Sequence, residues 1–220
     1  MKILIVGGGG REHAIAWKVA QNINVTKIYC APGNAGISQI AECVDIAATD
    51  IDGLLAFAKD NQIDLTIVGM DDPLVMGIVD EFQQAGLKIF GPSKKAAQIE
   101  GSKSFSKELM RKYHIPTATF EVFEDPIKAK EYLRQGDYPI VLKADGLALG
   151  KGVLICNTLE EALDGVDQIM VDKKFGTAGN KLVIEEFMTG PEVSVLAYCD
   201  GEHILPMTSA QDHKRAKDGD

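Results

Sequence analysis

Short apolar runs alternate with segments of helical spacing along the first 90 residues of the chain. The apolar runs, which predict strands, lie at 2–6, 25–30, 64–68 and 88–90. The segments with apolar residues on one helical face, which predict helices, lie at 11–21, 51–61 and 75–85. Strands that alternate with helices are typical of a mostly parallel sheet. The pattern therefore predicts a doubly wound α/β domain over residues 1–100, with ligands at the carboxyl ends of its strands.

The pattern changes after residue 100, where antiparallel strands replace the alternation. Ser102 is a candidate N-cap for a helix that ends at Ile115-Pro116. Further helices are predicted at 129–133 and 159–170. The predicted strands lie at 139–142, 153–156, 181–185, 192–199 and 203–205, with Asp200-Gly201 as the turn between the last two. This half of the chain is therefore predicted to be α+β.

Charge and composition narrow the classes of partner. The formal charge of -9 argues against nucleic acid and anionic membranes, while local basic loops still allow phosphate ligands. No apolar run approaches the roughly 20 residues that span a bilayer. Met1-Lys2 leads directly into a strand, so we expect no signal peptide and a cytoplasmic protein. We expect the four cysteines to be reduced core residues, because they lie within or beside apolar runs: Cys30, Cys43, Cys156 and Cys199.

The stretch from Lys143 to Val153 is the most informative part of the sequence, because it joins two predicted strands through a loop rich in glycine and lysine. Its glycines and lysines are Gly146, Gly150, Gly152, Lys143 and Lys151. The glycines leave backbone N–H groups free to face an anion, and the lysines suit the phosphates of a nucleoside triphosphate. A Walker A loop differs, because it ends in Gly-Lys-Ser/Thr and opens a helix. The alternative is a basic surface hairpin, although a plain hairpin needs fewer glycines.

A second glycine run, Gly7–Gly10, follows the first predicted strand and opens the first predicted helix. Backbone N–H groups at such a helix N-terminus bind phosphate, and Arg11 is a natural partner for that anion. A dinucleotide-binding fold needs an acidic residue near the end of the second strand, where this chain has Tyr29-Cys30-Ala31-Pro32. This absence argues against NAD. The alternative is a turn that only packs the helix against the strand.

Acidic residues follow the strand predicted at 181–185. Glu185 and Glu186 end the strand, and Phe187 and Glu192 come next. A strand end of this kind can bind the edge of adenine, and a later carboxylate can accept from ribose hydroxyls. The alternative is an acidic strand end that faces water.

The segment Gln211-Asp-His-Lys-Arg215 gathers several kinds of polar chemistry. His213 is a candidate acid or base near neutral pH. Lys214 and Arg215 are candidates for holding an anion. The alternative is a solvated loop.

The motifs together resemble a known enzyme family. Lys103, the glycine-lysine loop, Glu185-Glu-Phe187 and Glu192 come in the order seen in ATP-grasp enzymes, which clamp ATP between two α+β lobes. The most specific matches are Gly-Gly-Arg-Glu-His-Ala at 9–14, Ala-Pro-Gly-Asn-Ala-Gly at 31–36, Gly-Ser-Lys-Ser-Phe at 101–105, the loop at 144–153 and Gln-Asp-His-Lys-Arg at 211–215. Across essentially the whole chain, these pieces resemble the phosphoribosylamine–glycine ligases, also called glycinamide ribonucleotide synthetases.

The resemblance implies a domain at 1–100 followed by an incomplete ATP-grasp domain at 101–220, with a glycine-loop lobe at about 124–188 and the start of a second lobe at about 189–220. It implies ligation of glycine to 5-phosphoribosylamine in de novo purine biosynthesis, with glycyl phosphate as intermediate and ATP converted to ADP and phosphate. It also implies Mg²⁺, whose ligands are expected beyond residue 220. We therefore expect this chain to be the amino-terminal half of the enzyme and to be inactive alone.

The resemblance also implies roles for particular residues. ATP is expected on Lys103, Lys143, Gly150, Lys151, Gly152, Glu185, Glu186, Phe187 and Glu192. The phosphoribosyl group is expected on Gly9, Gly10, Arg11 and Asp71. Glycine and the γ-phosphate are expected to meet at the catalytic residues Asp212, Lys214 and Arg215.

One segment departs from the family pattern, and two other functions stay open. Where the family usually has Gly-Pro-Glu-x-Pro-Leu, this chain has Gly69-Met-Asp-Asp-Pro-Leu74, which weakens the substrate role of Asp71 and makes Asp72 its alternative. One other function is a different ATP-grasp ligase or carboxylase, which would have no use for Arg11. The other is a non-catalytic nucleotide-binding module, which would bind ATP without turnover.

Overall fold

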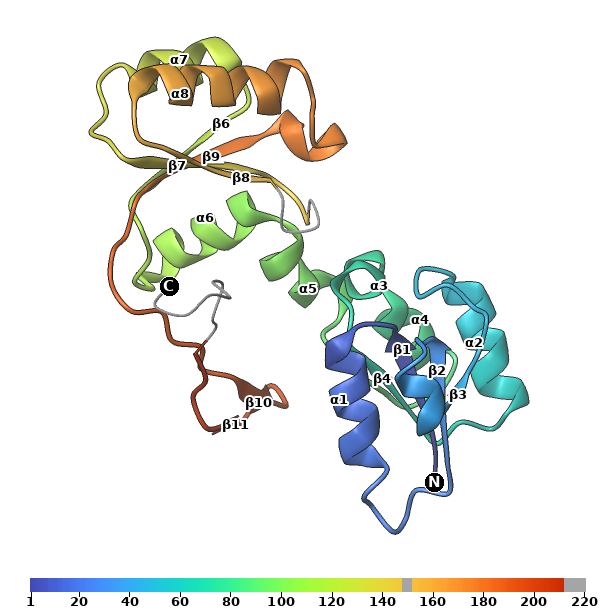
Figure 1. Ribbon diagram of the computed structural model, residues 1–220. Helices are drawn as coiled ribbons and strands as arrows, with labels where there is room; N and C mark the ends of the chain where they lie inside the picture. The colour runs from blue at the N-terminus through green and yellow to red at the C-terminus, as the bar shows by residue number, and fades with distance from the viewer. Residues whose placement is uncertain (148–151, 212–220) are drawn as a thin grey trace. The chain divides into compact units, whose positions relative to one another are not determined.

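The computed structural model describes residues 1–147 and 152–211. The chain divides into two compact units, Met1–Glu186 and Phe187–Asp220. The first unit contains a five-stranded parallel sheet and a four-stranded antiparallel sheet (Figure 1). The predicted order of an α/β part followed by an α+β part is confirmed. The predicted domain and lobe boundaries stay predictions.

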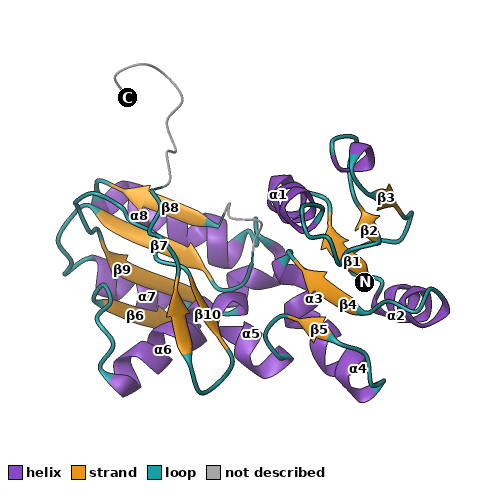
Figure 2. Ribbon diagram, turned by 90° about the horizontal axis from the view of Figure 1, so that it is seen from below, coloured by secondary structure: helices purple, strands orange, loops and turns teal. Residues whose placement is uncertain are grey.

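The parallel sheet has the strand order β3-β2-β1-β4-β5 and is covered on both faces. Its strands are β1 (Lys2–Gly7), β2 (Lys27–Pro32), β3 (Glu42–Cys43), β4 (Leu65–Val68) and β5 (Ile89–Phe90). Its helices are α1 (Gly10–Val19), η1 (Ile37–Gln39), α2 (Ile51–Asp60), α3 (Asp71–Met76) and α4 (Ile78–Gln84). Because side chains alternate along β1, Leu4 and Val6 pack with α2 and α4, whereas Ile3 and Ile5 pack with α1 and η1 (Figure 2). The doubly wound arrangement is therefore confirmed.

The helix predicted at 75–85 is wrong in its extent. The chain forms α3 and α4 there, separated by Gly77 with a φ of 106°. This left-handed conformation ends α3, and glycine adopts it without steric cost. The helix α5 (Lys94–Gly101), capped by the Ser93 side chain, was not predicted either, because it has a single buried apolar residue, Ala97.

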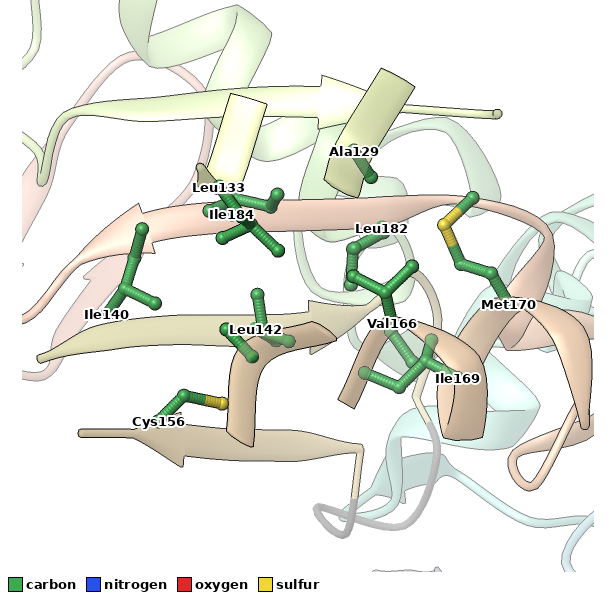
Figure 3. Close-up of a cluster of buried hydrophobic side chains, with 12 residues drawn as sticks. Ala129, Leu133, Ile140, Leu142, Cys156, Val166, Ile169, Met170, Leu182 and Ile184 are labelled. Atoms are coloured by element: carbon green, nitrogen blue, oxygen red, sulfur yellow. The ribbon is translucent and has the colours of Figure 1, made fainter. Parts of the chain in front are cut away.

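The antiparallel sheet has the strand order β6-β9-β7-β8. Its strands are β6 (Phe120–Phe123), β7 (Ile140–Ala144), β8 (Val153–Cys156) and β9 (Leu182–Glu186). The helical segments of this part are α6 (Lys103–Tyr113), α7 (Pro126–Leu133), α8 (Leu159–Val166), the π-helical η3 (Asp167–Val171) and η4 (Gly176–Asn180). The helices α7 and α8 cover one face of the sheet (Figure 1). Leu142, Leu182 and Ile184 lie on that face in one buried cluster with Leu133, Val166 and Ile169, which forms the core of this part (Figure 3).

The register of β7 and β9 determines which side chains lie on the opposite face. Val141 pairs with Glu185, and Lys143 pairs with Val183. Because successive side chains point to opposite faces, Lys143 and Glu185 lie on the face away from α7 and α8. This face carries the polar chemistry of the sheet.

The second unit contains an antiparallel hairpin of β10 (Ala197–Cys199) and β11 (Ile204–Pro206). The Asp200 side chain accepts hydrogen bonds from the backbone of Glu202 and His203, as a turn residue does. The predicted hairpin is confirmed, but the strand predicted at 192–199 is shorter. Its earlier part contributes an isolated bridge from Ser194 to Ala210.

The cysteine prediction holds for two of the four thiols. Cys30 and Cys156 are buried, whereas Cys43 and Cys199 are exposed, and all four are free. Cys43 lies on the two-residue edge strand β3, and Cys199 lies on the two-stranded hairpin of the second unit. In the part of the chain that the structure describes, no helix is long and apolar enough to cross a membrane.

Candidate active site

The glycine turn between β1 and α1 is closed by a buried carboxylate. Gly7 has a φ of 130°, and Gly9 donates its backbone N–H to Glu12 Oε2 at 2.6 Å. Glu12 is 2% exposed and lies in the first turn of α1, where the helix dipole favours negative charge. A methyl group on Gly69 would lie 2.2 Å from Glu12 Oε1, so Gly69 must be small to accommodate this carboxylate. The turn is therefore a packed structure, which supports the packing role as well as the phosphate role.

The structure brings Arg11 and Asp71 together beside this turn. Arg11 Nη1 donates to the carbonyl of Gly69 at 3.0 Å and lies 3.6 Å from Asp71 Oδ1. Both side chains are substantially exposed, so the pair adds little stability. A cavity of about 590 Å³ opens beside them. Its lining includes Gly8, Gly9, Gly10, Arg11, Ala48, Thr49 and Met70.

The loop after β2 is joined to the glycine turn. Asn34 donates its side-chain amide to the carbonyl of Gly8 at 2.8 Å and accepts from the backbone of Gly36 and Ile37. The Cys30 thiol donates to the carbonyl of Gly7 at 3.3 Å, and burial raises its pKa to about 12. Cys30 is therefore a neutral thiol at physiological pH and supports the turn without reactivity.

A cluster of two lysines and one glutamate lies on the face of the antiparallel sheet opposite α7 and α8, where α6 contributes Lys107. Glu185 Oε2 accepts from Lys143 Nζ at 2.8 Å and lies 3.3 Å from Lys107 Nζ. The side chains of Glu185 and Lys107 are 5% and 9% exposed, while that of Lys143 is 28% exposed. Glu185 is thus not the water-facing acidic strand end that was the alternative interpretation. Removing one partner from a buried ion pair leaves an uncompensated charge and costs about 3–5 kcal/mol, so Glu185 depends on its lysine partners.

The beginning of α6 is tied to the start of the glycine-lysine loop. Asp145 accepts from the Ser104 backbone at 3.0 Å and from the hydroxyls of Ser102 and Ser104. Lys103 Nζ donates to the carbonyl of Gly146 at 2.5 Å. The Asp145 carboxylate at the N-terminus of α6 is favourable because the helix dipole attracts negative charge there. Together with the Lys103 contact, it fixes the start of α6 against residues 145 and 146.

The remaining predicted residues are distributed as follows. Gly152 is buried, and its carbonyl accepts from the backbone of Ala144 at 2.8 Å. Glu186 is exposed at the end of β9, and its backbone N–H donates to the carbonyl of Thr119. Phe187 and Glu192 are exposed residues of the second unit. The predicted positions that lie outside the described residues are Gly150, Lys151, Asp212, Lys214 and Arg215.

Three residues of this region were missed by sequence reasoning. Glu12 lies at the third residue of a helix that follows a glycine turn, and this position is the signal that predicts a cap. Lys107 lies one helical turn after Lys103, so that spacing placed it on the same face of α6. Asp145 had no signal, because its partners on α6 are about 40 residues away in the sequence.

Metal ions and phosphate groups place different demands on the described residues. Within residues 1–147 and 152–211, no group of three or more His, Cys, Asp or Glu side chains could hold a metal ion. The lysines on the antiparallel sheet suit phosphate groups, and so does the helix N-terminus at the glycine turn, although Glu12 already accepts from the Gly9 N–H there.

Comparison with solved structures identifies the fold class. The phosphoribosylamine–glycine ligase of Thermotoga maritima superimposes with a TM-score of 0.82 at 32% identity, over 100% of this chain and 52% of that chain. The biotin carboxylase domain of the Hydrogenobacter thermophilus 2-oxoglutarate carboxylase, solved with MgADP, has a TM-score of 0.70 at 17% identity, over 87% of this chain and 45% of that chain. The second similarity concerns the fold alone. The fold is that of the ATP-grasp ligases and carboxylases.

Sequence comparison identifies the family within that class. Residues 1–100 match the phosphoribosylglycinamide synthetase N domain, and residues 101–220 match the phosphoribosylglycinamide synthetase ATP-grasp (A) domain. The phosphoribosylamine–glycine ligase of Halalkalibacterium halodurans is 54% identical over 220 residues, which are 100% of this chain and 51% of that protein. The chain therefore belongs to the phosphoribosylglycinamide synthetase family. It spans about half the length of the curated relatives it matches. An ATP-grasp domain implies binding of ATP and Mg²⁺.

Proposed function

We propose that this chain supplies the amino-terminal domain and much of the ATP site of an enzyme that joins glycine to 5-phosphoribosylamine. The supporting observation is that both parts of the chain match this family and that the relatives carry the name of that ligase. The product, glycinamide ribonucleotide, belongs to de novo purine biosynthesis, and we place the enzyme in the cytoplasm.

The proposed reaction has two steps. The carboxylate of glycine attacks the γ-phosphorus of ATP, which forms glycyl phosphate and releases ADP. The amine of 5-phosphoribosylamine then attacks the carbonyl carbon of glycyl phosphate, loses a proton, and displaces inorganic phosphate. Neither step needs a covalent enzyme nucleophile, so the enzyme contributes positioning and neutralisation of charge.

ATP is proposed to lie beside Lys143, on the face of the antiparallel sheet opposite α7 and α8, and at the end of β9. Lys143, near the end of β7, and Lys103, at the start of α6, both lie beside the start of the glycine-lysine loop, which suits contact with phosphates. The loop at 150–152 is proposed to cover the phosphates, where Lys151 would add a further positive charge. Glu185, Glu186 and Phe187 are proposed for adenine, and Glu192 for ribose. Mg²⁺ would add charge neutralisation at the phosphates, with ligands outside the described residues.

The phosphoribosyl group is proposed to bind at the glycine turn. Gly9, Gly10 and Arg11 line the cavity there, and Asp71 lies next to Arg11. Backbone N–H groups and a guanidinium are a common pair of donors for phosphate. Glycine and the γ-phosphate are proposed to meet at Asp212, Lys214 and Arg215.

The test is an assay of ADP release by the complete gene product with glycine and freshly made phosphoribosylamine. We expect ADP only when both substrates are present. ADP release without either substrate, or with a different acid, would keep the ATP-grasp class and reject this ligase. The 220-residue chain alone is expected to release no glycine-dependent ADP.

A further inference from the structure

The two lysines that share Glu185 differ in how firmly they are held. The Lys107 ammonium faces three oxygens: Glu185 Oε2 at 3.3 Å, Thr117 Oγ1 at 2.8 Å and the Ala118 carbonyl at 3.3 Å. An ammonium has three donors, so Lys107 is saturated inside the protein. It also lies 5.3 Å from the centre of the Phe120 ring, which adds a favourable cation–π contact.

Lys143 reaches the same carboxylate oxygen from β7 but remains more accessible. Its side chain is 28% exposed, against 9% for Lys107. Its contact with Glu185 Oε2, at 2.8 Å, is its one ion pair in the part of the chain that the structure describes. Lys143 is therefore the lysine of the pair that can turn toward a ligand, whereas Lys107 is fixed.

The charges of the cluster explain why two lysines are present. Glu185 is 5% exposed, and a buried carboxylate without a partner is strongly disfavoured. With a single lysine as partner, Glu185 would hold that lysine and oppose its departure. With Lys107 fixed beside it, Glu185 keeps a positively charged partner when Lys143 moves away. The departure of Lys143 also relieves the repulsion between the Lys107 and Lys143 ammonium groups, which share one carboxylate oxygen.

We propose that Lys107 is a positioning residue that keeps Glu185 neutralised and so frees Lys143 to bind the phosphates of ATP. The inference rests on the proposed function, because it takes ATP as the ligand of this face. Lys107 itself does not contact the nucleotide. Lys107 shifts the equilibrium between two states of Lys143, one paired with Glu185 and one bound to the phosphates of ATP.

The inference predicts an effect that depends on the phosphates. In Lys107→Met, the complete gene product is expected to bind ATP at least roughly tenfold more weakly, because Lys143 must then leave Glu185 without a partner. A tenfold change in affinity corresponds to about 1.4 kcal/mol. Adenosine affinity is expected to stay unchanged, since adenosine does not need Lys143 to move. Lys107→Arg, which keeps the charge, is expected to bind ATP like the unchanged protein.

A double variant tests the route of the effect. In Lys107→Met with Glu185→Gln, no buried charge remains to hold Lys143, so the ratio of ATP affinity to adenosine affinity is expected to recover relative to Lys107→Met alone; the ratio removes any effect of Glu185→Gln on the proposed adenine contact. A general loss of packing would not recover in this way. If Lys107→Met does not fold, the double variant and Lys107→Arg carry the test, because neither leaves an unpaired carboxylate.

The experiment is isothermal titration calorimetry of the complete gene product and its variants with ATP and with adenosine. Lys130→Met is the matched control, since it removes a lysine from a 2.6 Å ion pair with Asp167, outside the Glu185 cluster. Equal weakening of ATP and adenosine in Lys107→Met, unchanged ATP affinity, or no recovery in the double variant would each overturn the inference. If Lys143→Met weakens ATP binding and Lys107→Met does not, the proposed ATP site stands and the inference fails. If the unchanged protein binds no ATP, both fail.

Discussion

Replacing Gly8 by alanine tests whether the glycine turn depends on close approach of two backbone segments. Gly8 does not have a positive φ, so an alanine there meets no conformational barrier of its own. Its new methyl group would lie 2.6 Å from the carbonyl oxygen of Gly33. That oxygen belongs to the backbone of the loop after β2, so it cannot rotate away as the end of a flexible side chain can.

The size of the effect follows from these contacts. The loop would have to retreat by about 0.4 Å to bring the oxygen to 3.0 Å, the lower limit that real Cβ contacts show. Overpacking of this kind costs about 1–3 kcal/mol. The hydrogen bond from Asn34 to the Gly8 carbonyl would be strained as well, at a cost of up to about 1 kcal/mol. The reduced entropy of the unfolded chain returns about 0.4–1 kcal/mol. The middle of these ranges gives an expected net loss of about 2 kcal/mol.

Gly10→Ala is the matched control in the same turn. No atom lies within 4 Å of the position that its methyl group would take, and Gly10 is the first residue of α1. We expect this variant to be neutral or more stable by about 0.4–1 kcal/mol. Urea unfolding followed by circular dichroism, with Trp17 of α1 as a fluorescent probe, measures both variants. Equal stability of Gly8→Ala and Gly10→Ala would refute the argument.

Three further predictions concern the core, the substrate site and the buried thiol. Leu142→Ala is expected to lower the free energy of unfolding by about 2–5 kcal/mol, because Leu142 is fully buried in the core under α7 and α8; a smaller loss in urea unfolding would contradict this packing. Arg11→Ala in the complete gene product is expected to raise the KM for phosphoribosylamine roughly tenfold and to leave the KM for ATP unchanged, because the loss of a charged hydrogen bond has about that effect. An unchanged KM for phosphoribosylamine would favour another ATP-grasp ligase. Cys30 has a folded pKa raised by burial, from 9.0 to about 12, so its contribution to stability is complete below pH 9 and is lost as the pH rises from 9 to about 12. Thiol labelling of the native protein at pH 8 should modify Cys43 and spare Cys30, and modification of Cys30 before unfolding would disprove its burial.

Local sequence determined much of the secondary structure. The alternation of apolar runs with helical segments predicted the parallel sheet, because a strand buried on both faces must be apolar throughout. Ser102 was correctly predicted as a cap, and its hydroxyl accepts from the backbone of Phe105. Asp200-Gly201 was correctly predicted as a turn. These features depend on residues a few positions apart, so the sequence shows them directly.

Elements that depend on distant partners were missed or misplaced. The break at Gly77 was not predicted, because a single glycine within a helical pattern is often tolerated. Gly77 packs against the side chain of Lys94 on α5, and α3 and α5 lie against each other. Strands β3 and β6 were missed because each contains a glutamate, so neither forms an uncharged, mostly apolar run like those that predicted β4 and β8.

The sequence by itself determined the two kinds of sheet, the glycine turn, the glycine-lysine loop and the resemblance to the family, since each is a pattern of neighbouring residues. The tertiary structure alone decided that Lys107, Lys143 and Glu185 form one buried cluster. Lys143 and Glu185 are 42 residues apart and meet because β9 pairs with β7 in a register that puts both on one face. Strand order and register are set by the packing of the whole core under α7 and α8. For this reason no local pattern could show that Glu185 faces two lysines and not water.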